Sequence, residues 1–331
     1  MALKFSCADY TFPLLSLRQR LSLIRLLGFQ YVDLGLFARE SQLSPKALMA
    51  SPSKFIKHLK HDLDNADLSV SDVFLQIGET PDDCAVNNPN LLVRERNRAV
   101  FQYVLDLCAS LGCKHLSGLP GVQHPEIEKT RDDARALAET AWRMEMASQA
   151  GLLYSIEPHI GSICWDVDST LTFLKAIPRL TLTLDYGHFI AAGQLSETVH
   201  SLVPFASHVH VRGGAKSHLQ TSLKENGIDF EGMLERLANR SYRGFLALEY
   251  VWTDWQGCNR TDNLSETILL RKYLTRFDDH SPEIMDGWPR WKPCTRPNVS
   301  DENHAVREWP AKKASPPSTS VQDRQSYLDA E

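Results

Sequence analysis

Short apolar or β-branched segments alternate along the chain with longer segments of helical periodicity, over about 275 residues. We expect strands at Leu3–Ala8, Tyr31–Leu36, Ser69–Leu75, His115–Gly118, Leu152–Glu157, Leu180–Asp185, His208–Val211 and Phe245–Tyr250. Helical periodicity is clearest over Leu17–Leu27, Pro45–Ala66, Leu91–Leu111 and Thr130–Ala150. Glycine is a common helix stop, and one precedes the next strand at Gly28, Gly112 and Gly151. Eight β–α alternations predict a parallel sheet closed into a (β/α)8 TIM barrel.

An open doubly wound sheet is the alternative architecture, but no GxGxxG motif follows the first strand. We assign residues 1–275 to the barrel and residues 276–331 to a C-terminal extension. This extension holds 7 of the 17 prolines and the tryptophans Trp288, Trp291 and Trp309. We expect residues 276–310 to pack on the barrel through these indoles and residues 311–331 to be disordered.

Composition narrows the class of protein. The formal net charge is -5 and no basic stripe is present, which argues against a nucleic-acid partner. The seven cysteines form no CxxC pair, which favours a reducing compartment over a disulfide framework. We find no signal peptide and no apolar run long enough to span a membrane, so we expect a cytoplasmic protein without a membrane partner. The sequence leaves a homo-oligomer open.

Four consecutive predicted strands of the second half end in side chains that can bind a metal ion. These residues are Glu157, Asp185, His210 and Glu249, separated by 28, 25 and 39 residues. Each interval suits one strand, loop and helix, so the four side chains recur at one end of the barrel. Barrel active sites lie at that C-terminal end.

Strand periodicity predicts which way these side chains point, because successive residues alternate faces. Each candidate shares its face with the less apolar positions of its strand: Leu153, Ser155 and Glu157; Thr181, Thr183 and Asp185; His208, His210 and Arg212; Phe245, Ala247 and Glu249. The helices require the more apolar face. All four candidates therefore point into the barrel.

Three converging carboxylates repel one another strongly unless a cation lies between them. A single Glu or Asp at a strand end is usually a helix cap or a surface ion pair, but four at matched positions favour a metal site. Oxygen ligands with one imidazole suit Mn²⁺ first, with Mg²⁺ or Co²⁺ as alternatives. We therefore expect one divalent ion per chain.

The segments that carry these residues, IEPHIGS, LDYGH, HVHVR and GFLALEY, together with the IDF segment at 228–230, resemble the xylose-isomerase-like barrel family of sugar phosphate isomerases and epimerases. The resemblance covers roughly residues 3–275. It implies that Glu157, Asp185, His210 and Glu249 hold one metal ion and that His188 contacts the substrate.

The chain departs from the epimerases of that family at one position. Those enzymes carry a substrate-gripping arginine six residues after the metal histidine, where this chain has Lys216, and its nearest arginine is Arg212. We predict substrate contacts from His159, Arg212, Lys216 and Trp252.

The sequence thus favours a metal-dependent isomerase or epimerase that acts on a sugar or sugar-like keto substrate through an enediolate intermediate. In this hypothesis Glu157 and Glu249 are the catalytic acid–base pair, and His188 holds or protonates a substrate oxygen.

A metal-dependent lyase that eliminates the aglycone from a 3-keto-glycoside is the main alternative. An abasic-site endonuclease would need more histidines and a basic groove. A barrel that only binds a metabolite is a further alternative, which the intact ligand set disfavours.

Overall fold

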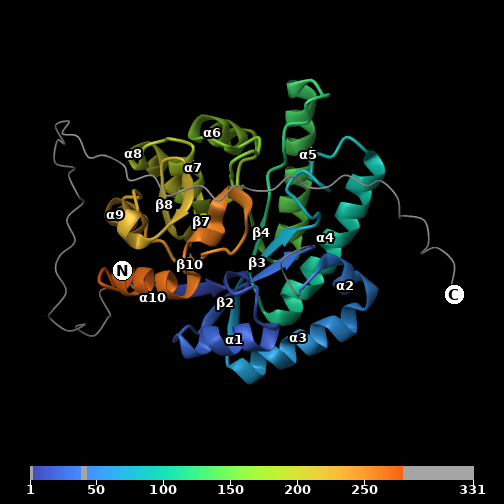
Figure 1. Ribbon diagram of the computed structural model, residues 1–331. Helices are drawn as coiled ribbons and strands as arrows, with labels where there is room; N and C mark the ends of the chain where they lie inside the picture. Colours follow the sequence, from blue (N-terminus) through green and yellow to red (C-terminus); the bar gives the residue numbers. More distant parts are fainter. Residues whose placement is uncertain (1–2, 39–42, 279–331) are drawn as a thin grey trace, which may run out of the picture. The chain divides into compact units, whose positions relative to one another are not determined.

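A computed structural model describes residues 3–38 and 43–278 of the chain. Within these residues eight parallel strands form a closed barrel in the order β1-β10-β7-β6-β5-β4-β3-β2 (Figure 1). The strands are β1 Phe5–Ala8, β2 Tyr31–Phe37, β3 Ser69–Gln76, β4 His115–Gly118, β5 Leu153–Ile156, β6 Thr181–Asp185, β7 Ala206–Val211 and β10 Leu246–Leu248. The predicted (β/α)8 barrel is confirmed.

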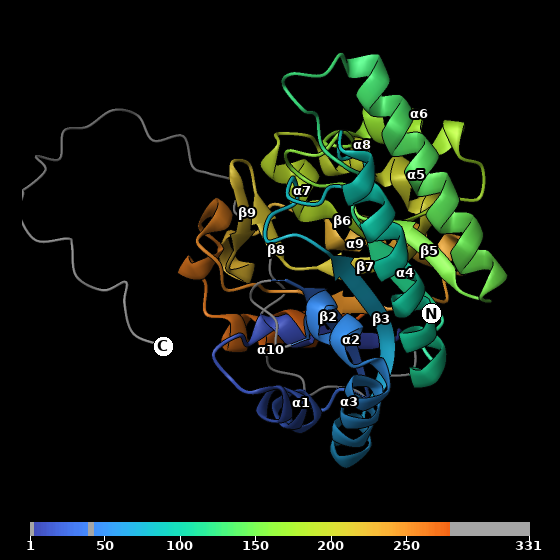
Figure 2. The same ribbon diagram turned by 90° about the vertical axis from the view of Figure 1, so that its right-hand side faces the viewer.

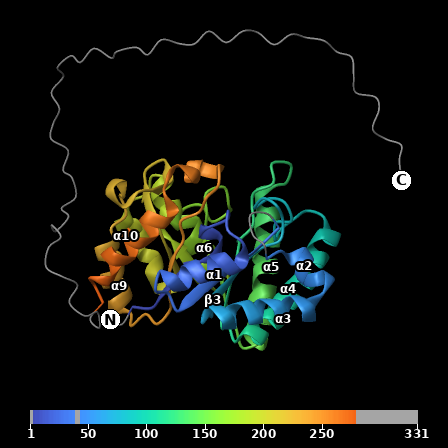
Figure 3. The same cartoon turned by 60° about the horizontal axis from the view of Figure 1, so that its bottom comes forward.

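Helices surround the strands, as Figure 2 shows from a second direction. In Figure 3, α9 and α10 lie on one side and α2 to α5 on the other. The α-helices are α1 Leu17–Leu26, α2 Pro45–Ala50, α3 Pro52–Ala66, α4 Leu91–Leu111, α5 Lys129–Gln149, α6 Val167–Ala176, α7 Tyr186–Ala191, α8 Ser196–Val199, α9 Phe230–Asn239 and α10 Asn263–Thr275. Short 3₁₀ turns lie at η1 Asp9–Thr11, η2 His200–Phe205, η3 Leu223–Glu225 and η4 Trp255–Arg260.

The two faces of the strands differ in polarity. The hydrophobic core includes buried leucine, isoleucine and valine side chains from the strands, among them Ile156, Leu182 and Val209. The hydroxyls of Ser117, Ser155 and Thr183, from β4, β5 and β6, instead bond one another inside the barrel. Because β-branched and aliphatic side chains usually fill a TIM barrel, this polar interior is unusual.

One predicted helix is divided in two, and one hairpin adds to the predicted strands. The predicted helix over 45–66 is two helices, because Pro52 disfavours a helical conformation at Ser51, whose φ and ψ are -158° and 69°. The segment after β7 forms an antiparallel hairpin, β8 Gly213–Ala215 with β9 His218–Thr221. Ser217 supplies the left-handed residue of its turn, with φ 65°.

Two expectations from the sequence concern the C-terminal extension and membrane-spanning helices. The predicted packing of Trp288, Trp291 and Trp309 and the predicted disorder of residues 311–331 lie outside the described residues. No helix within 3–38 and 43–278 combines the length and apolar character that crossing a bilayer requires.

Candidate metal centre and active site

The barrel brings the four predicted metal ligands to its C-terminal end. Glu157 directly follows β5, Asp185 ends β6, His210 lies in β7, and Glu249 directly follows β10. All four side chains are buried, with at most 4% of each residue exposed. Parallel strands place their carboxyl ends at the same rim, so residues far apart in the sequence meet there.

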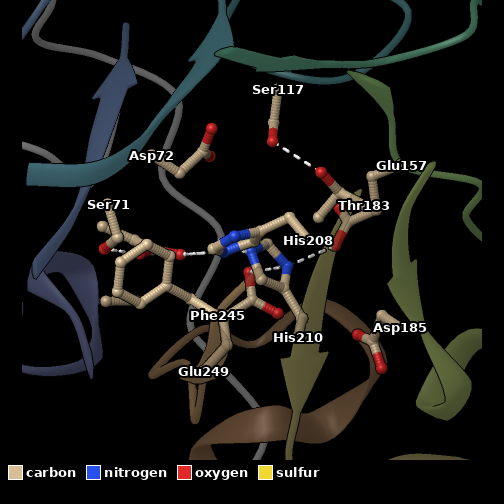
Figure 4. A network of polar contacts seen from close by, with 12 residues as sticks. Ser71, Asp72, Ser117, Glu157, Thr183, Asp185, His208, His210, Phe245 and Glu249 are labelled. Carbon is tan, nitrogen blue, oxygen red and sulfur yellow. Dashed lines mark hydrogen bonds and ion pairs between the residues drawn. The ribbon is translucent and has the colours of Figure 1, made fainter. Parts of the chain in front are cut away.

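The ligand atoms converge on two overlapping groups. One comprises Glu157, His210 and Glu249, and the other Glu157, Asp185 and His188, with ligand atoms in each group within 4.8 Å of one another. His210 Nδ1 lies 2.6 Å from Glu157 Oε1 and 3.3 Å from Glu249 Oε1. Figure 4 shows Glu157 and Glu249 on either side of the His210 imidazole. Glu157 therefore joins the two groups into one cluster.

Electrostatic coupling within the cluster is strong. Burial, and then the Glu249 carboxylate, raises the pKa of Glu157 to about 7. Burial also opposes ionisation of Glu249, yet His210 and Arg212 lower its pKa to about 2. Against the effect of burial, Glu249 and Glu157 raise the pKa of His210 well above its usual value. Positive charge on His210 and Arg212 thus offsets the negative charge of the carboxylates.

This donor set fits a divalent cation. It offers three carboxylates and one imidazole without a thiolate, the ligands preferred by hard or borderline metal ions. Oε2 of Glu249 is buried and accepts no hydrogen bond from the described residues. Arg212 Nη2 lies 3.4 Å away as an ion-pair partner, and a cation at this position would add the close contact that this buried oxygen lacks.

Arg212 directly follows β7 and reaches into the same cluster as His210. Only 3% of it is exposed, and its Nη2 donates a hydrogen bond to Asp185 Oδ2. The same nitrogen lies 3.4 Å from Glu249 Oε2. The other oxygen of Asp185 caps α7 by accepting the Gly187 N–H at 2.7 Å. The guanidinium is therefore an internal counter-ion for two predicted metal ligands, as well as part of the cavity wall.

His188 lies in the first turn of α7 beside Asp185. Its Nε2 is 3.7 Å from Asp185 Oδ2, and its Nδ1 accepts the Ile160 N–H at 3.4 Å. Burial, and then the nearby Arg212, lowers the pKa of His188 well below its usual value. The imidazole is therefore neutral at physiological pH and lines the cavity.

His159 also lines the cavity as a neutral ring, because burial lowers its pKa to about 4. Its Nδ1 donates to the carbonyl oxygen of Ile160 at 2.9 Å. That assignment leaves Nε2 as an acceptor, and this buried atom has no hydrogen-bond partner among the described residues. His159 thus presents an unused acceptor at the cavity.

The outer wall of the cavity is largely aromatic and apolar. Its apolar lining comprises Tyr10, Pro13, Phe37, Phe74, Pro81, Leu119, Val251, Trp252 and Trp255. The two indoles are 43% and 42% exposed, so they form an open rim rather than core. Lys216 does not line this cavity and is exposed beside the turn of the β8–β9 hairpin. Of the four predicted substrate contacts, the structure brings His159, Arg212 and Trp252 together.

Sequence reasoning missed several polar contacts of the cluster. Tyr10, which follows β1, donates its hydroxyl to Glu249 Oε1 at 2.8 Å. Asp33 of β2 and Asp72 of β3 lie with His208 and His210 in a further group of ligand atoms within 4.8 Å. Applied to β2, the alternation rule used for the later strands would have pointed Asp33 inward, opposite Val32, Leu34 and Leu36. The two faces of β3 are equally apolar, so the rule gives no direction for Asp72.

Solved structures share this fold at low sequence identity. A D-allulose 3-epimerase from Methylomonas sp. is 17% identical with a TM-score of 0.64, over 83% of this chain and 99% of that chain. A D-tagatose 3-epimerase-like protein is 20% identical with a TM-score of 0.64, over 83% and 98%. A probable 3-DHS dehydratase involved in petrobactin synthesis from Bacillus anthracis is 15% identical with a TM-score of 0.60, over 82% and 99%.

At these identities the likeness establishes the fold alone. The search of curated proteins found no match. A family model described as xylose isomerase-like TIM barrel matches residues 21–273, which include all four predicted metal ligands. The chain belongs to the xylose isomerase-like TIM barrel family.

Proposed function

We propose that this protein is a divalent-metal-dependent isomerase or epimerase of a sugar or sugar-like keto compound. The observation that carries the proposal is the convergence of Glu157 and Glu249 on one imidazole at the mouth of the barrel, where both line the cavity. The likeness in fold to a D-allulose 3-epimerase and a D-tagatose 3-epimerase-like protein supports this reaction class.

Glu157, Asp185, His210 and Glu249 would hold the ion, with Mn²⁺ the first candidate and Mg²⁺ or Co²⁺ the alternatives. A bound divalent cation supplies Lewis acidity, which polarises neighbouring carbonyl and hydroxyl oxygens and acidifies the C–H bond beside the carbonyl. The ion also offsets the mutual repulsion of the three carboxylates.

Glu157 and Glu249 supply the proton chemistry. They come from β5 and β10, which are separated in the barrel by β6 and β7. Groups on two sides of a bound substrate can act on the two faces of one carbon. One side chain, as a carboxylate, removes the proton from this carbon to give an enediolate. The other, as a carboxylic acid, donates a proton to the opposite face of the same carbon. The hydrogen bond from Tyr10 fixes the orientation of Glu249 for this role.

The remaining cavity residues bind and orient the substrate. His188 and His159 present neutral imidazoles: His188 can hold or protonate a substrate oxygen, and Nε2 of His159 can accept a hydrogen bond from a substrate hydroxyl. Arg212 is the cationic side chain among the lining residues, and Trp252 can stack on an apolar ring face. Lys216 would need movement of its hairpin to contribute, and its role stays a prediction.

A lyase acting on a 3-keto-glycoside is the second candidate. The aromatic rim formed by Phe37, Phe74, Trp252 and Trp255 favours it, because an apolar aglycone would pack there. Both reactions begin with removal of a proton beside a carbonyl. Elimination then releases the aglycone, whereas epimerisation returns the proton to carbon.

The cellular setting is part of the proposal. The six cysteines among the described residues are free thiols, which supports the expectation of a reducing, cytoplasmic compartment. We expect a small carbohydrate as the partner molecule, and a homo-oligomer remains open to measurement.

A substrate screen in deuterated water tests the reaction class. We expect Mn²⁺-loaded protein to place deuterium on the carbon beside the carbonyl of at least one ketose, inosose or 3-keto-glycoside. Recovery of the epimer or isomer supports the proposal, and release of an aglycone supports the lyase. Protein stripped with EDTA is the control and should give neither. Absence of exchange and of product with every compound would contradict both candidates.

A further inference from the structure

Below the metal centre the barrel interior contains a second set of buried polar groups. Asp33, in the middle of β2, is fully buried. Its Oδ2 lies 2.6 Å from His208 Nε2 and 3.6 Å from His210 Nε2. Its Oδ1 accepts a hydrogen bond from the Ser71 hydroxyl. Asp33 therefore faces the one ring nitrogen of His210 that does not point at Glu157 and Glu249.

The two nitrogens of His210 have different surroundings. Nδ1 faces the carboxylates of the metal cluster, whereas Nε2 is buried and makes no hydrogen bond within the described residues. An imidazole that binds a cation through one nitrogen carries its proton on the other. Metal-binding histidines usually donate that N–H to a carboxylate or carbonyl, which fixes the ring orientation. Among the described residues, Asp33 is the carboxylate paired with Nε2.

Asp33 is itself held rigidly. His208 stacks on His115 with ring centroids 5.1 Å apart, and His115 Nδ1 lies 2.6 Å from Asp72 Oδ1. His115 Nε2 lies 2.8 Å from the Ser207 hydroxyl. Figure 4 shows His208 and His210 side by side at the centre of this network, with Ser71 and Asp72 on one flank.

We propose that Asp33 is a positioning residue for the metal ligand His210, held in place by His208 and Ser71. This inference rests on the proposed metal centre. Burial of charge in a barrel core costs free energy unless each group is paired. The role explains why β2 and β7 place an acid and two imidazoles where aliphatic side chains would otherwise fill the core.

Mn²⁺ binding to the metal-free protein, followed by electron paramagnetic resonance, tests the proposal. Asp33→Asn keeps the shape but removes the charged acceptor, so we expect affinity about 10- to 100-fold lower with one ion still bound per chain. We also expect a changed zero-field splitting of the bound Mn²⁺. Asp132→Asn is the matched control, since Asp132 of α5 is equally buried and pairs with His124 and Arg135 rather than with any residue of this network. The Mn²⁺ affinity of this control should stay within about threefold of wild type, a much smaller change than the loss expected for Asp33→Asn.

The outcomes separate this inference from the proposed function. Equal weakening by both substitutions, or no weakening by Asp33→Asn, overturns the positioning role while the metal centre stands. A fall from two bound ions to one would make Asp33 a ligand of a second ion and also overturn it. If wild-type protein binds no Mn²⁺, the proposed function fails as well. Should Asp33→Asn not fold, Ser71→Ala removes one hydrogen bond to Asp33, and unchanged affinity in that variant would count against the proposal.

Discussion

Replacing Glu157 or Glu249 with glutamine is expected to lower turnover by about 10²- to 10⁴-fold, the usual cost of losing a positioned acid or base. Both side chains touch His210 and line the cavity, so each can act on a bound substrate. Glutamine preserves the size of the side chain but cannot accept a proton. The rates should be measured at saturating Mn²⁺, because a weakened metal site would also lower turnover.

Deuterium exchange distinguishes a base from a ligand. An enzyme with two bases can keep proton exchange on one face after losing the other base. We therefore expect one of the two variants to incorporate solvent deuterium into unconverted substrate without forming product. Glu145→Gln, an exposed glutamate of α5, is the control and should keep wild-type rates. Near-normal turnover in both metal-saturated variants would mean that the glutamates are ligands only. The base would then be sought at His188 or His159.

Arg212→Gln is expected to tighten Mn²⁺ binding while lowering turnover. In the structure the guanidinium pairs with Asp185 and lies 3.4 Å from Glu249, so a metal ion must bind next to an existing positive charge. Two unit charges 4 Å apart interact by about 4 kcal/mol at an effective dielectric constant of 20. Removing the cation should therefore raise Mn²⁺ affinity at least about tenfold, which corresponds to about 1.4 kcal/mol.

Isothermal titration of metal-free protein with Mn²⁺ measures this effect. Lys216→Gln is the matched control, because it removes one positive charge from an exposed site beside the hairpin turn that does not line the cavity. We expect its affinity to match that of wild type. Unchanged or weaker Mn²⁺ binding in folded Arg212→Gln protein would show that the guanidinium does not compete with the ion.

The sequence was informative where strand periodicity and chemistry coincide. Each of Glu157, Asp185, His210 and Glu249 lies at or next to the end of a predicted strand, on its less apolar face, and a closed barrel brings such positions to one rim. In the structure all four residues belong to the cluster that Glu157 joins together. Their role as metal ligands stays a proposal.

Other features depend on contacts that no local pattern encodes. Packing between β2 and β7 decides which ring nitrogen His210 turns toward Asp33. These strands are distant in the sequence, since the contacting residues His208 and Asp33 are 175 residues apart. Arg212 could be predicted to point inward, but its pairing with Asp185 required the structure. The hairpin at β8–β9 was missed because its strands are only three and four residues long.

The central claim is that Glu157, Asp185, His210 and Glu249 hold one divalent ion that the reaction requires. Measuring bound Mn²⁺ per chain in wild-type protein and in Asp185→Asn, with activity before and after EDTA, tests it most directly. We predict one ion per wild-type chain, loss of activity with EDTA, and recovery with Mn²⁺ or Co²⁺. We also predict much weaker Mn²⁺ binding by Asp185→Asn, because an amide lacks the charge that offsets the cation's desolvation. Full activity in metal-free protein, or no bound ion in wild type, would contradict the account.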